Sequence, residues 1–229
     1  MRWSSRCRPR RFGITAVTHD PPSPSTHGFV EAYAALTPAL RAAMAAAREV
    51  GVVALPAGAG AALRLLAAVI QARTVVEIGT GTGVSGLWLL GGMRADGVLT
   101  TIDAEQEHQR LARRAFAMAG HAPGRARIIT GRALDVLPRL ADGGYDLVFV
   151  DGPVSDYAAC VVAARRLLRA GGLLVLNRMF GVNGRVVDPT ARDPDTVALR
   201  EIARQARDSE EWLPALLPSG EGLLCLMRR

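Results

Sequence analysis

The chain has 229 residues, 49% of them hydrophobic, and a formal net charge of +7. This length suits one domain with a sizeable core, and no apolar run reaches the roughly 18–20 residues that span a bilayer, so we expect a soluble protein. Five arginines and one aspartate lie in residues 1–27, which leaves the rest of the chain with a charge of only +3. This weakens a nucleic-acid-binding interpretation of the basic composition.

Composition divides the chain into two parts. Residues 1–27 are rich in arginine, proline and serine, and we expect a disordered extension. A nucleic-acid arm or a transit-like segment are alternatives, whereas a secretory signal would need a continuous apolar core. Residues 28–229 are predicted to form a single domain. The three cysteines are far apart and form no C-x-x-C motif, which fits a reducing, cytoplasmic compartment.

Secondary structure is predicted from apolar periodicity and from glycine and proline positions. Residues 28–49 form an alanine-rich helical stretch that is broken near Pro38, and residues 60–72 form a second helix. Strands and helices then alternate. The expected strands are 74–78, 98–103, 125–130, 145–151 and 173–177. The helices that follow the first four of them are 85–93, 105–120 with Gly120 as its cap, 133–140 and 156–172.

The C-terminal part has a different pattern. A helix at 194–208 precedes two strand-like runs, WLPALLP and GLLCLMRR, joined by the turn sequence SGEG. Two strands joined by a short glycine-containing turn form an antiparallel hairpin. Apolar strands that alternate with amphipathic helices form a parallel sheet covered on both faces. We therefore predict an α/β fold with a mostly parallel sheet that ends in an antiparallel pair.

Three strand ends carry polar or glycine-rich sequence where open parallel sheets bind ligands. The first is the loop 79–83 in VVEIGTGTGVS, and the other two end in Asp103 and Asp151. Asp103 follows Gly83 by 20 residues, the spacing at which an acid can accept hydrogen bonds from ribose hydroxyls. The loop reads G-x-G-x-G, which differs from the dinucleotide spacing G-x-G-x-x-G, and the chain has no lysine for a phosphate-binding loop. An acid before such a loop is typical of class I methyltransferases.

From about Tyr33 onward the sequence resembles the caffeoyl-CoA/catechol-type O-methyltransferases and their bacterial members. The resemblance lies in VVEIGTGTGVSGLWLL, GVLTTIDAEQEHQRLAR, ARIITGRALDVLPRL, YDLVFVDGPVSDY, GRVVDPTARDPDTVALREI and LLPSGEGLLCLMRR. It implies a Rossmann-like class I methyltransferase fold with a seven-stranded sheet, S-adenosylmethionine as cofactor and a homodimer.

The resemblance also implies a set of cofactor-binding residues. The loop positions and the ribose acid are matched by Glu77, Gly79, Gly81, Ser85 and Asp103, with Ala133 on the adenine side, Leu55 packing over the cofactor and Asp151 after the fourth strand. Two of these have structural alternatives. Glu77 can cap the N–H groups of its own loop, and Ser85 can serve as a helix N-cap.

Family members bind a divalent metal through an Asp after the fourth strand and an Asp-Asn pair after the fifth. Asp151 matches the first position, but at the second we align Leu176-Asn177, and leucine offers no ligand. Asp151 and Asn177 alone would form a weak site for a hard cation such as Mg²⁺. The family lysine three residues beyond the first Asp is Val154 here. These differences predict an enzyme with little metal dependence.

The catalytic base is not fixed by the sequence. Asp151, Asp156 and Tyr157 lie near the strand ends, and Asp151 and Tyr157 are our candidates, although a tyrosine at a helix start also serves packing. His108 and His121 are expected on the surface. We predict an S-adenosylmethionine-dependent O-methyltransferase of a small molecule, with no membrane or nucleic-acid partner. A cofactor-binding but inactive regulatory or scaffold protein and an RNA methyltransferase are the alternatives.

Overall fold

The computed structural model describes residues 24–229, and most of the expected N-terminal extension lies outside this range. A single sheet contains the strands β1 (Thr74–Ile78), β2 (Val98–Asp103), β3 (Ala126–Thr130), β4 (Tyr145–Val150), β5 (Leu168–Leu176), β6 (Trp212–Leu217) and β7 (Leu223–Arg228). Their order is β3-β2-β1-β4-β5-β7-β6. The first five pair in parallel, and β7 runs antiparallel to both β5 and β6. The predicted α/β class and the C-terminal antiparallel hairpin are confirmed.

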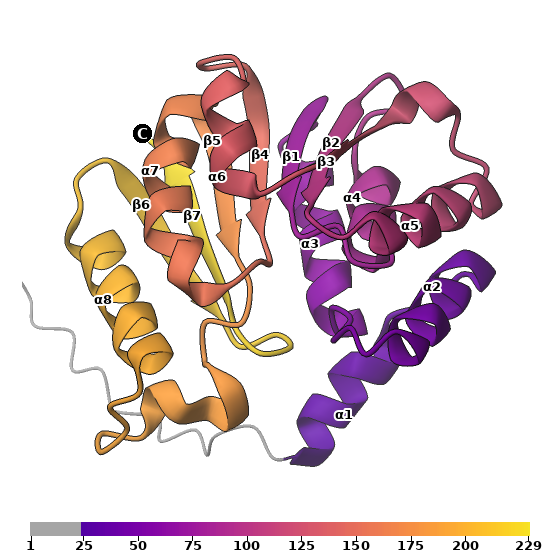
Figure 1. The fold of residues 1–229 in the computed structure, drawn as a ribbon. Helices are drawn as coiled ribbons and strands as arrows, with labels where there is room; N and C mark the ends of the chain where they lie inside the picture. Colours follow the sequence, from indigo (N-terminus) through magenta and orange to yellow (C-terminus); the bar gives the residue numbers. More distant parts are fainter. Residues whose placement is uncertain (1–23) are drawn as a thin grey trace, which may run out of the picture.

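Helices cover both faces of this sheet (Figure 1). The α-helices of the described residues are α1 (Pro24–Tyr33), α2 (Pro38–Glu49), α3 (Ala57–Val69), α4 (Val84–Gly92), α5 (Gln106–Met118), α6 (Ala133–Val136), α7 (Tyr157–Leu167) and α8 (Pro194–Asp208). Of these, α1 lies away from the sheet and contacts α3. Short 3₁₀ segments cover Pro123–Arg125, Leu137–Arg139, Val154–Asp156 and Val182–Val187. In Figure 1 α7 and α8 lie on the left and α4 and α5 on the right, with the strands between them.

Successive strand residues point to opposite faces and so build two cores. Val75 and Phe149 pack with α2, α3, α4 and α5 in one core. Their neighbours Val76 and Val150 pack with α7 and α8 in the other. The continuous apolar runs of β1 and β4 are explained by this burial on both sides, because neither face of a central strand meets water.

Helix ends follow the local sequence signals. Thr37 caps α2, since its Oγ1 accepts a hydrogen bond from the Leu40 N–H at 3.2 Å, and Pro38 occupies the first turn. Gly120 follows α5 with φ +78°, and the N–H of His121 reaches the Phe116 carbonyl at 3.1 Å. This is the Schellman arrangement that a left-handed glycine permits. The break near Pro38 and the capping role of Gly120 are confirmed.

Several element boundaries differ from the sequence prediction, including α3, which begins and ends three residues earlier than the expected 60–72. The helix expected at 156–172 ends at Leu167, and β5 begins at Leu168 instead of at 173. Leu168 is fully buried and pairs with Tyr145, after which the register between β4 and β5 shifts. The helix α1 begins at Pro24, four residues before the predicted domain boundary. Tertiary pairing therefore overrides the helix-like composition of residues 168–172.

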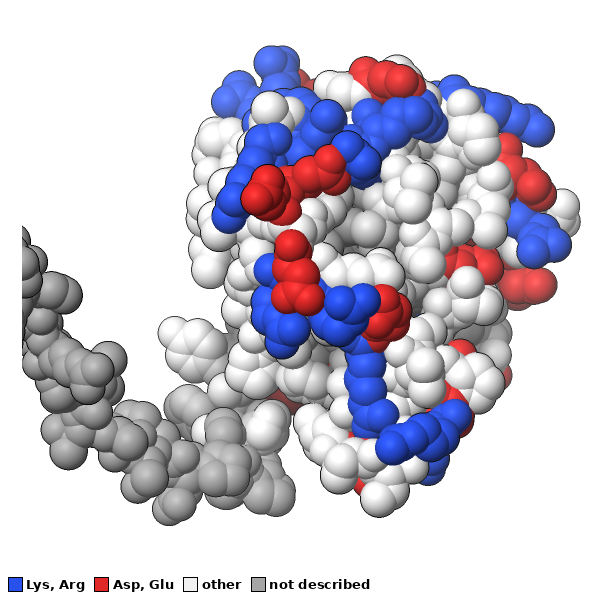
Figure 2. Space-filling model, turned by 90° about the vertical axis from the view of Figure 1, so that its left-hand side faces the viewer, with Lys and Arg blue, Asp and Glu red and all other residues white. Residues whose placement is uncertain are grey.

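Charges of both signs are mixed on the surface of the domain. Figure 2 views the side on which α7 and α8 lie, and arginines there stand next to acidic side chains. Ion pairs such as Arg165–Glu211 and Arg204–Glu201 belong to these helices and the loop before β6. Among the described residues, no helix is both long and apolar enough to cross a membrane.

Candidate functional site

A cleft of about 830 Å³ lies at the carboxyl ends of the parallel strands. It is lined by residues of the α2–α3 connection, the loop after β1, the end of β2, the start of α6, the segment after β4 and one residue after β5. In the sheet, β1 has β2 as its neighbour on one side and β4 on the other, so the strand order reverses direction at β1 and the cleft lies at this switch point. Of the residues proposed from the sequence, Leu55, Gly79, Gly81, Ser85, Asp103, Ala133 and Asp151 line this cleft.

The loop after β1 adopts a conformation that requires glycine at its first position. Gly79 has φ +92°, and a Cβ on it would lie only 2.3 Å from the carbonyl oxygen of Asp151. The Gly79 N–H donates to the Ile102 carbonyl at 2.9 Å, and the Asp151 N–H donates to the Ile78 carbonyl at 2.8 Å. Gly79 therefore holds the ends of β1, β2 and β4 at the close approach from which the cleft is built.

Asp103 connects the glycine loop to the end of β2. Its Oδ2 accepts a hydrogen bond from the Gly81 N–H at 2.9 Å, and its Oδ1 accepts one from the Glu105 N–H at 2.9 Å. The Nδ1 of His108 lies 3.5 Å from Oδ1, and His108 also lines the cleft. His108 is the third residue of α5, and its side chain is 23% exposed, so it lies at the cleft as a partly exposed residue rather than on the outer surface that we expected.

Glu77 lies behind the cleft and does not line it. The residue is fully buried, and the Thr101 hydroxyl donates to its Oε2 at 2.6 Å. Burial raises the pKa of Glu77 from 4.5 to about 7, although hydrogen bonds from Ser85 and Thr101 partly oppose the shift. Thr101 also shares a hydrogen bond of 2.7 Å with Thr80 of the loop. The buried carboxyl group thus stabilises the glycine loop through the hydrogen bonds of Thr101.

Asp151 forms an ion pair with a residue that the sequence analysis missed. Its Oδ1 lies 2.8 Å from Nη2 of Arg178, which also donates to the Gly152 carbonyl at 3.0 Å. The Asp151 side chain is only 13% exposed, and burial raises its pKa while Arg178 and Asn177 lower it. Arg178 lines the cleft and follows the buried strand β5 by two residues.

Of the other residues considered on the acceptor side, Asp156 lines the cleft, whereas Tyr157, Leu176 and Asn177 do not. Tyr157 is fully buried, and its hydroxyl donates to the Asn177 carbonyl at 3.1 Å. Burial raises the pKa of this phenol, so it is a structural residue in the core. Leu176 is fully buried in β5, and Asn177 is 3% exposed. Asn177 and Arg178 are therefore the residues beside Asp151, and Leu176, which we aligned with the first residue of the family pair, belongs to the core.

These residues do not fit a divalent cation. The carboxylate of Asp151 is already paired with a guanidinium, and the side chain of Asn177 is the only other oxygen donor that the sequence proposed. No cluster of three or more histidine, cysteine, aspartate or glutamate side chains within residues 24–229 could hold a metal. Hard cations need several oxygen ligands, and here a fixed positive charge already balances the one carboxylate.

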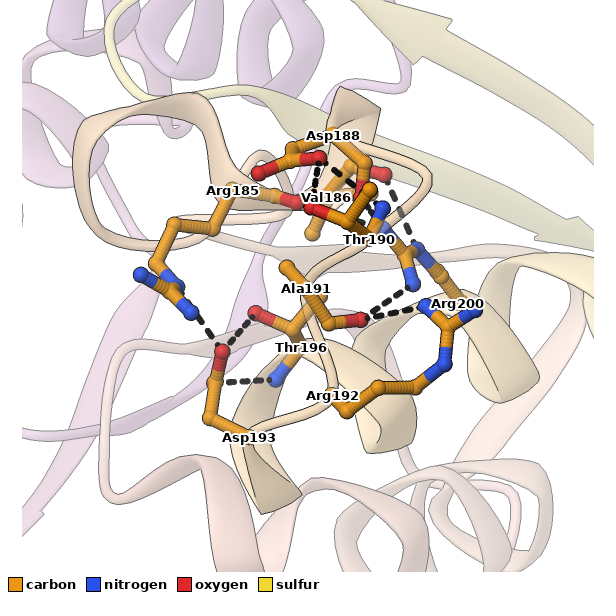
Figure 3. Close-up of polar contacts among 9 residues, drawn as sticks. All are labelled: Arg185, Val186, Asp188, Thr190, Ala191, Arg192, Asp193, Thr196 and Arg200. Atoms are coloured by element: carbon orange, nitrogen blue, oxygen red, sulfur yellow. Dashed lines mark hydrogen bonds and ion pairs between the residues drawn. The ribbon is translucent and has the colours of Figure 1, made fainter.

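The segment after Arg178 is held by its own polar contacts (Figure 3). Arg200 of α8 donates to the carbonyls of Val186 and Ala191, each at 2.9 Å. Asp193 caps α8 through the Thr196 N–H at 3.0 Å and pairs with Arg185 at 2.8 Å. The family-like segment GRVVDPTARDPDTVALREI is therefore a fixed loop followed by the first part of α8.

Comparisons with known proteins agree with this fold and cleft. A family model described as O-methyltransferase matches residues 33–229. A protein of Mycobacterium sp. (strain KMS), whose name places it among the O-methyltransferases, is 49% identical over 93% of this chain and 99% of its own length. The cofactor-bound structure of Rv0187 from Mycobacterium tuberculosis is 32% identical with a TM-score of 0.81, covering 92% of this chain and 99% of that one.

A further solved structure is informative about the cofactor. The O-methyltransferase TomG from Streptomyces achromogenes, solved in complex with S-adenosylmethionine, is 29% identical with a TM-score of 0.79. The match covers 89% of this chain and 96% of that one. The chain belongs to the O-methyltransferase family. The sequence-based interpretation as an S-adenosylmethionine-dependent O-methyltransferase is thereby confirmed, and the non-enzymatic alternative is not supported.

Proposed function

We propose that this enzyme transfers the methyl group of S-adenosylmethionine to an oxygen of a small molecule without a divalent cation. The observation that carries the metal-free part is the Asp151–Arg178 ion pair at 2.8 Å, which occupies the strand-end position of the metal site in the resembled family. The cofactor supplies a sulfonium-bound methyl group. The protein's task is to hold that group in line with the acceptor oxygen, so proximity and orientation supply much of the rate.

The cofactor lies, in this proposal, along the first half of the cleft. The carboxylate of Asp103 accepts hydrogen bonds from the ribose hydroxyls, and the backbone at Gly79 and Gly81 contacts the amino-acid end. Ala133 packs beside the adenine, and Leu55 packs over the cofactor. All of these residues line the cleft, and the N-terminus of α4 adds free N–H groups.

Two further residues support this half of the cleft. Ser85 belongs to the first turn of α4 and lines the cleft beside the loop. Glu77 does not face the cleft, because it is buried and accepts hydrogen bonds from Thr101 and Ser85. Its role is to fix the loop rather than to touch the cofactor.

The acceptor occupies the second half, next to Asp151. This carboxylate is the acceptor-side group that we propose to take up the hydroxyl proton, because it faces the cleft. The raised pKa of Asp151, which burial causes, favours such a role. Tyr157 is not proposed as a base, since its hydroxyl is committed to the Asn177 carbonyl.

Calorimetric titration tests this function. We expect saturable binding of S-adenosylmethionine and S-adenosylhomocysteine, unchanged by Mg²⁺ or EDTA, and methylation of phenols in the presence of EDTA. Absence of binding at about 1 mM cofactor would refute the proposal. Activity that depends on added Mg²⁺ would refute its metal-free part.

We also propose a homodimer in the cytoplasm. The resemblance implies the dimer, and α1 exposes Phe29 and Tyr33, which are 71% and 83% accessible and lie next to each other. A Phe29→Ser/Tyr33→Ser variant that remains dimeric in light scattering would exclude this surface as the interface. The free thiols of Cys160 and Cys225 are buried, which raises their pKa to about 12 and about 11, and unpaired cysteines fit a reducing compartment.

A further inference from the structure

Two arginines among the described residues line the cleft, and they lie at different ends of it. Arg132 adjoins Ala133 on the side proposed for adenine, whereas Arg178 faces Asp151 on the acceptor side. The acceptor half therefore contains a permanent positive charge. Arginine stays protonated at every relevant pH, so this charge cannot be removed by titration.

The guanidinium of Arg178 has donor capacity left after its protein contacts. Nη2 serves both the Asp151 carboxylate and the Gly152 carbonyl, at 2.8 and 3.0 Å. A guanidinium carries five N–H donors in a planar fork. Nε is buried, and the side chain as a whole remains 36% exposed while lining the cleft, so we assign the remaining Nη donors to the space left for the acceptor.

The backbone holds Arg178 in a conformation that arginine rarely adopts. Its φ is +54°, in the left-handed region, which is strained for a residue with a Cβ. The next two residues are fixed to the turn before β7, because the Met179 and Phe180 N–H groups donate to the Gly222 and Glu221 carbonyls at 3.0 and 2.9 Å. The Arg200 contacts of Figure 3 fix the loop beyond them. The fork is therefore preorganised.

We propose that Arg178 binds the acceptor oxygen as an anion and selects acceptors with a single acidic hydroxyl group, of the phenol class, over vicinal diols. The inference rests on the proposed methyl transfer. A metal ion can hold two neighbouring oxygens at once, whereas Arg178 offers donors along one edge of a fork that already binds Asp151. A second hydroxyl on the acceptor therefore gains nothing from this site.

The reaction balances in charge and atoms. The acceptor hydroxyl transfers its proton to the carboxylate of Asp151, which later releases it to water, and the oxyanion is stabilised by Arg178. An oxygen lone pair forms the bond to the methyl carbon, and the electron pair of the carbon–sulfur bond stays on sulfur. The sulfonium and the oxyanion thereby become a neutral thioether and a neutral methyl ether. The ion pair between Arg178 and Asp151 re-forms when Asp151 gives up the proton.

A competing role for Arg178 is to bind the carboxylate of the cofactor. The two roles separate experimentally, because one affects cofactor affinity and the other affects the acceptor. The matched control is Arg169→Gln, since Arg169 pairs with Asp146 at 2.6 Å at the opposite end of β4, outside the cleft. Asp146 keeps its hydrogen bonds from the Arg73 and Thr74 N–H groups in that variant.

The test uses the full-length enzyme saturated with S-adenosylhomocysteine and two probes, 4-nitrophenol and 4-nitrocatechol, both in EDTA. We expect 4-nitrophenol to bind as its coloured anion at a pH where the free probe is mostly neutral, with 4-nitrocatechol binding no more tightly. Arg178→Met should weaken 4-nitrophenol binding about 10- to 100-fold, the usual value of a hydrogen bond to a charged group. Arg178→Lys should retain part of the affinity, and Arg169→Gln all of it.

Other outcomes overturn the inference. Failure of wild-type enzyme to bind anionic 4-nitrophenol contradicts it, as does tighter binding of the catechol. Weakened S-adenosylhomocysteine affinity in Arg178→Met, with unchanged 4-nitrophenol binding, assigns Arg178 to the cofactor instead. Failure of the proposed function itself is distinct, because wild-type enzyme would then not bind S-adenosylhomocysteine at all.

Discussion

The two halves of the cleft are built in different ways. At the ends of β1 and β2, backbone groups define the site: Gly79 has a left-handed φ, and Asp103 accepts hydrogen bonds from two N–H groups. At the ends of β4 and β5, a single side-chain pair defines it, Asp151 with Arg178. Backbone geometry tolerates few substitutions, whereas one side chain can be exchanged without rebuilding the fold. The cofactor half is therefore the fixed part of this enzyme, and the acceptor half is the part that can change.

The largest loss of stability is expected from Gly79→Ala, a substitution in the cofactor half of the cleft. The new Cβ would lie 2.3 Å from the Asp151 carbonyl oxygen, and φ +92° adds strain. The free energy of unfolding should fall by more than about 3 kcal/mol, measured by urea denaturation, and cofactor binding should be lost. Gly120→Ala is the control, with φ +78° but no atom within 4 Å, and should cost about 1 kcal/mol. An equal loss of unfolding free energy in the two variants would show that the short distance between position 79 and the Asp151 carbonyl oxygen is unimportant.

The next effect concerns the buried carboxyl group under the loop. The pKa of Glu77 is raised from 4.5 to about 7, so the folded protein holds this proton more tightly than the unfolded chain does. Stability should therefore fall as the pH rises from about 4.5 to 7, by about 3 kcal/mol in total, and stay lower above pH 7.

Glu77→Gln should remove this pH dependence and be the more stable protein at pH 8. Denaturation curves at pH 5 and pH 8 measure it. Glu210→Gln, which changes an exposed carboxylate, should retain the wild-type pH dependence. An unchanged pH dependence in Glu77→Gln would mean that the pKa of Glu77 is the same in the folded protein as in the unfolded chain.

A smaller effect, on cofactor affinity, is expected at Asp103, whose side chain accepts hydrogen bonds from backbone N–H groups. Asp103→Asn keeps one oxygen for the Gly81 or Glu105 N–H but loses an acceptor for the ribose. Cofactor affinity should fall about 10- to 100-fold, which corresponds to 1.4–2.8 kcal/mol. Asp96→Asn alters an exposed carboxylate before β2 and should leave affinity unchanged. Wild-type affinity in Asp103→Asn would place the ribose elsewhere.

The same contrast explains what the sequence could predict. Glycine spacing, an acid 20 residues later and apolar strands are local signals, because left-handed turns and buried strands restrict residue type, so the cofactor half was found. Arg178 was missed because its importance arises from contact with Asp151, 27 residues earlier, across two neighbouring strands. Tyr157 was misjudged for the same reason, since only the packed structure shows its hydroxyl bonded to the Asn177 carbonyl.

The last prediction concerns a variant that introduces the metal-binding Asp-Asn pair, which the acceptor half lacks. Asn177→Asp/Arg178→Asn creates an Asp-Asn pair beside Asp151 and leaves two carboxylates without the guanidinium, an arrangement that attracts a hard cation. Mg²⁺ at ten times its Kd should then stabilise the variant by about 1.4 kcal/mol, seen as a rise in Tm. Wild-type Tm should not respond. Asn177→Asp alone should not respond either, because Arg178 can balance the new carboxylate. A Mg²⁺ response in wild type would show that Arg178 yields its place to a metal, and no response in the double variant would show that the acceptor half differs by more than these two side chains.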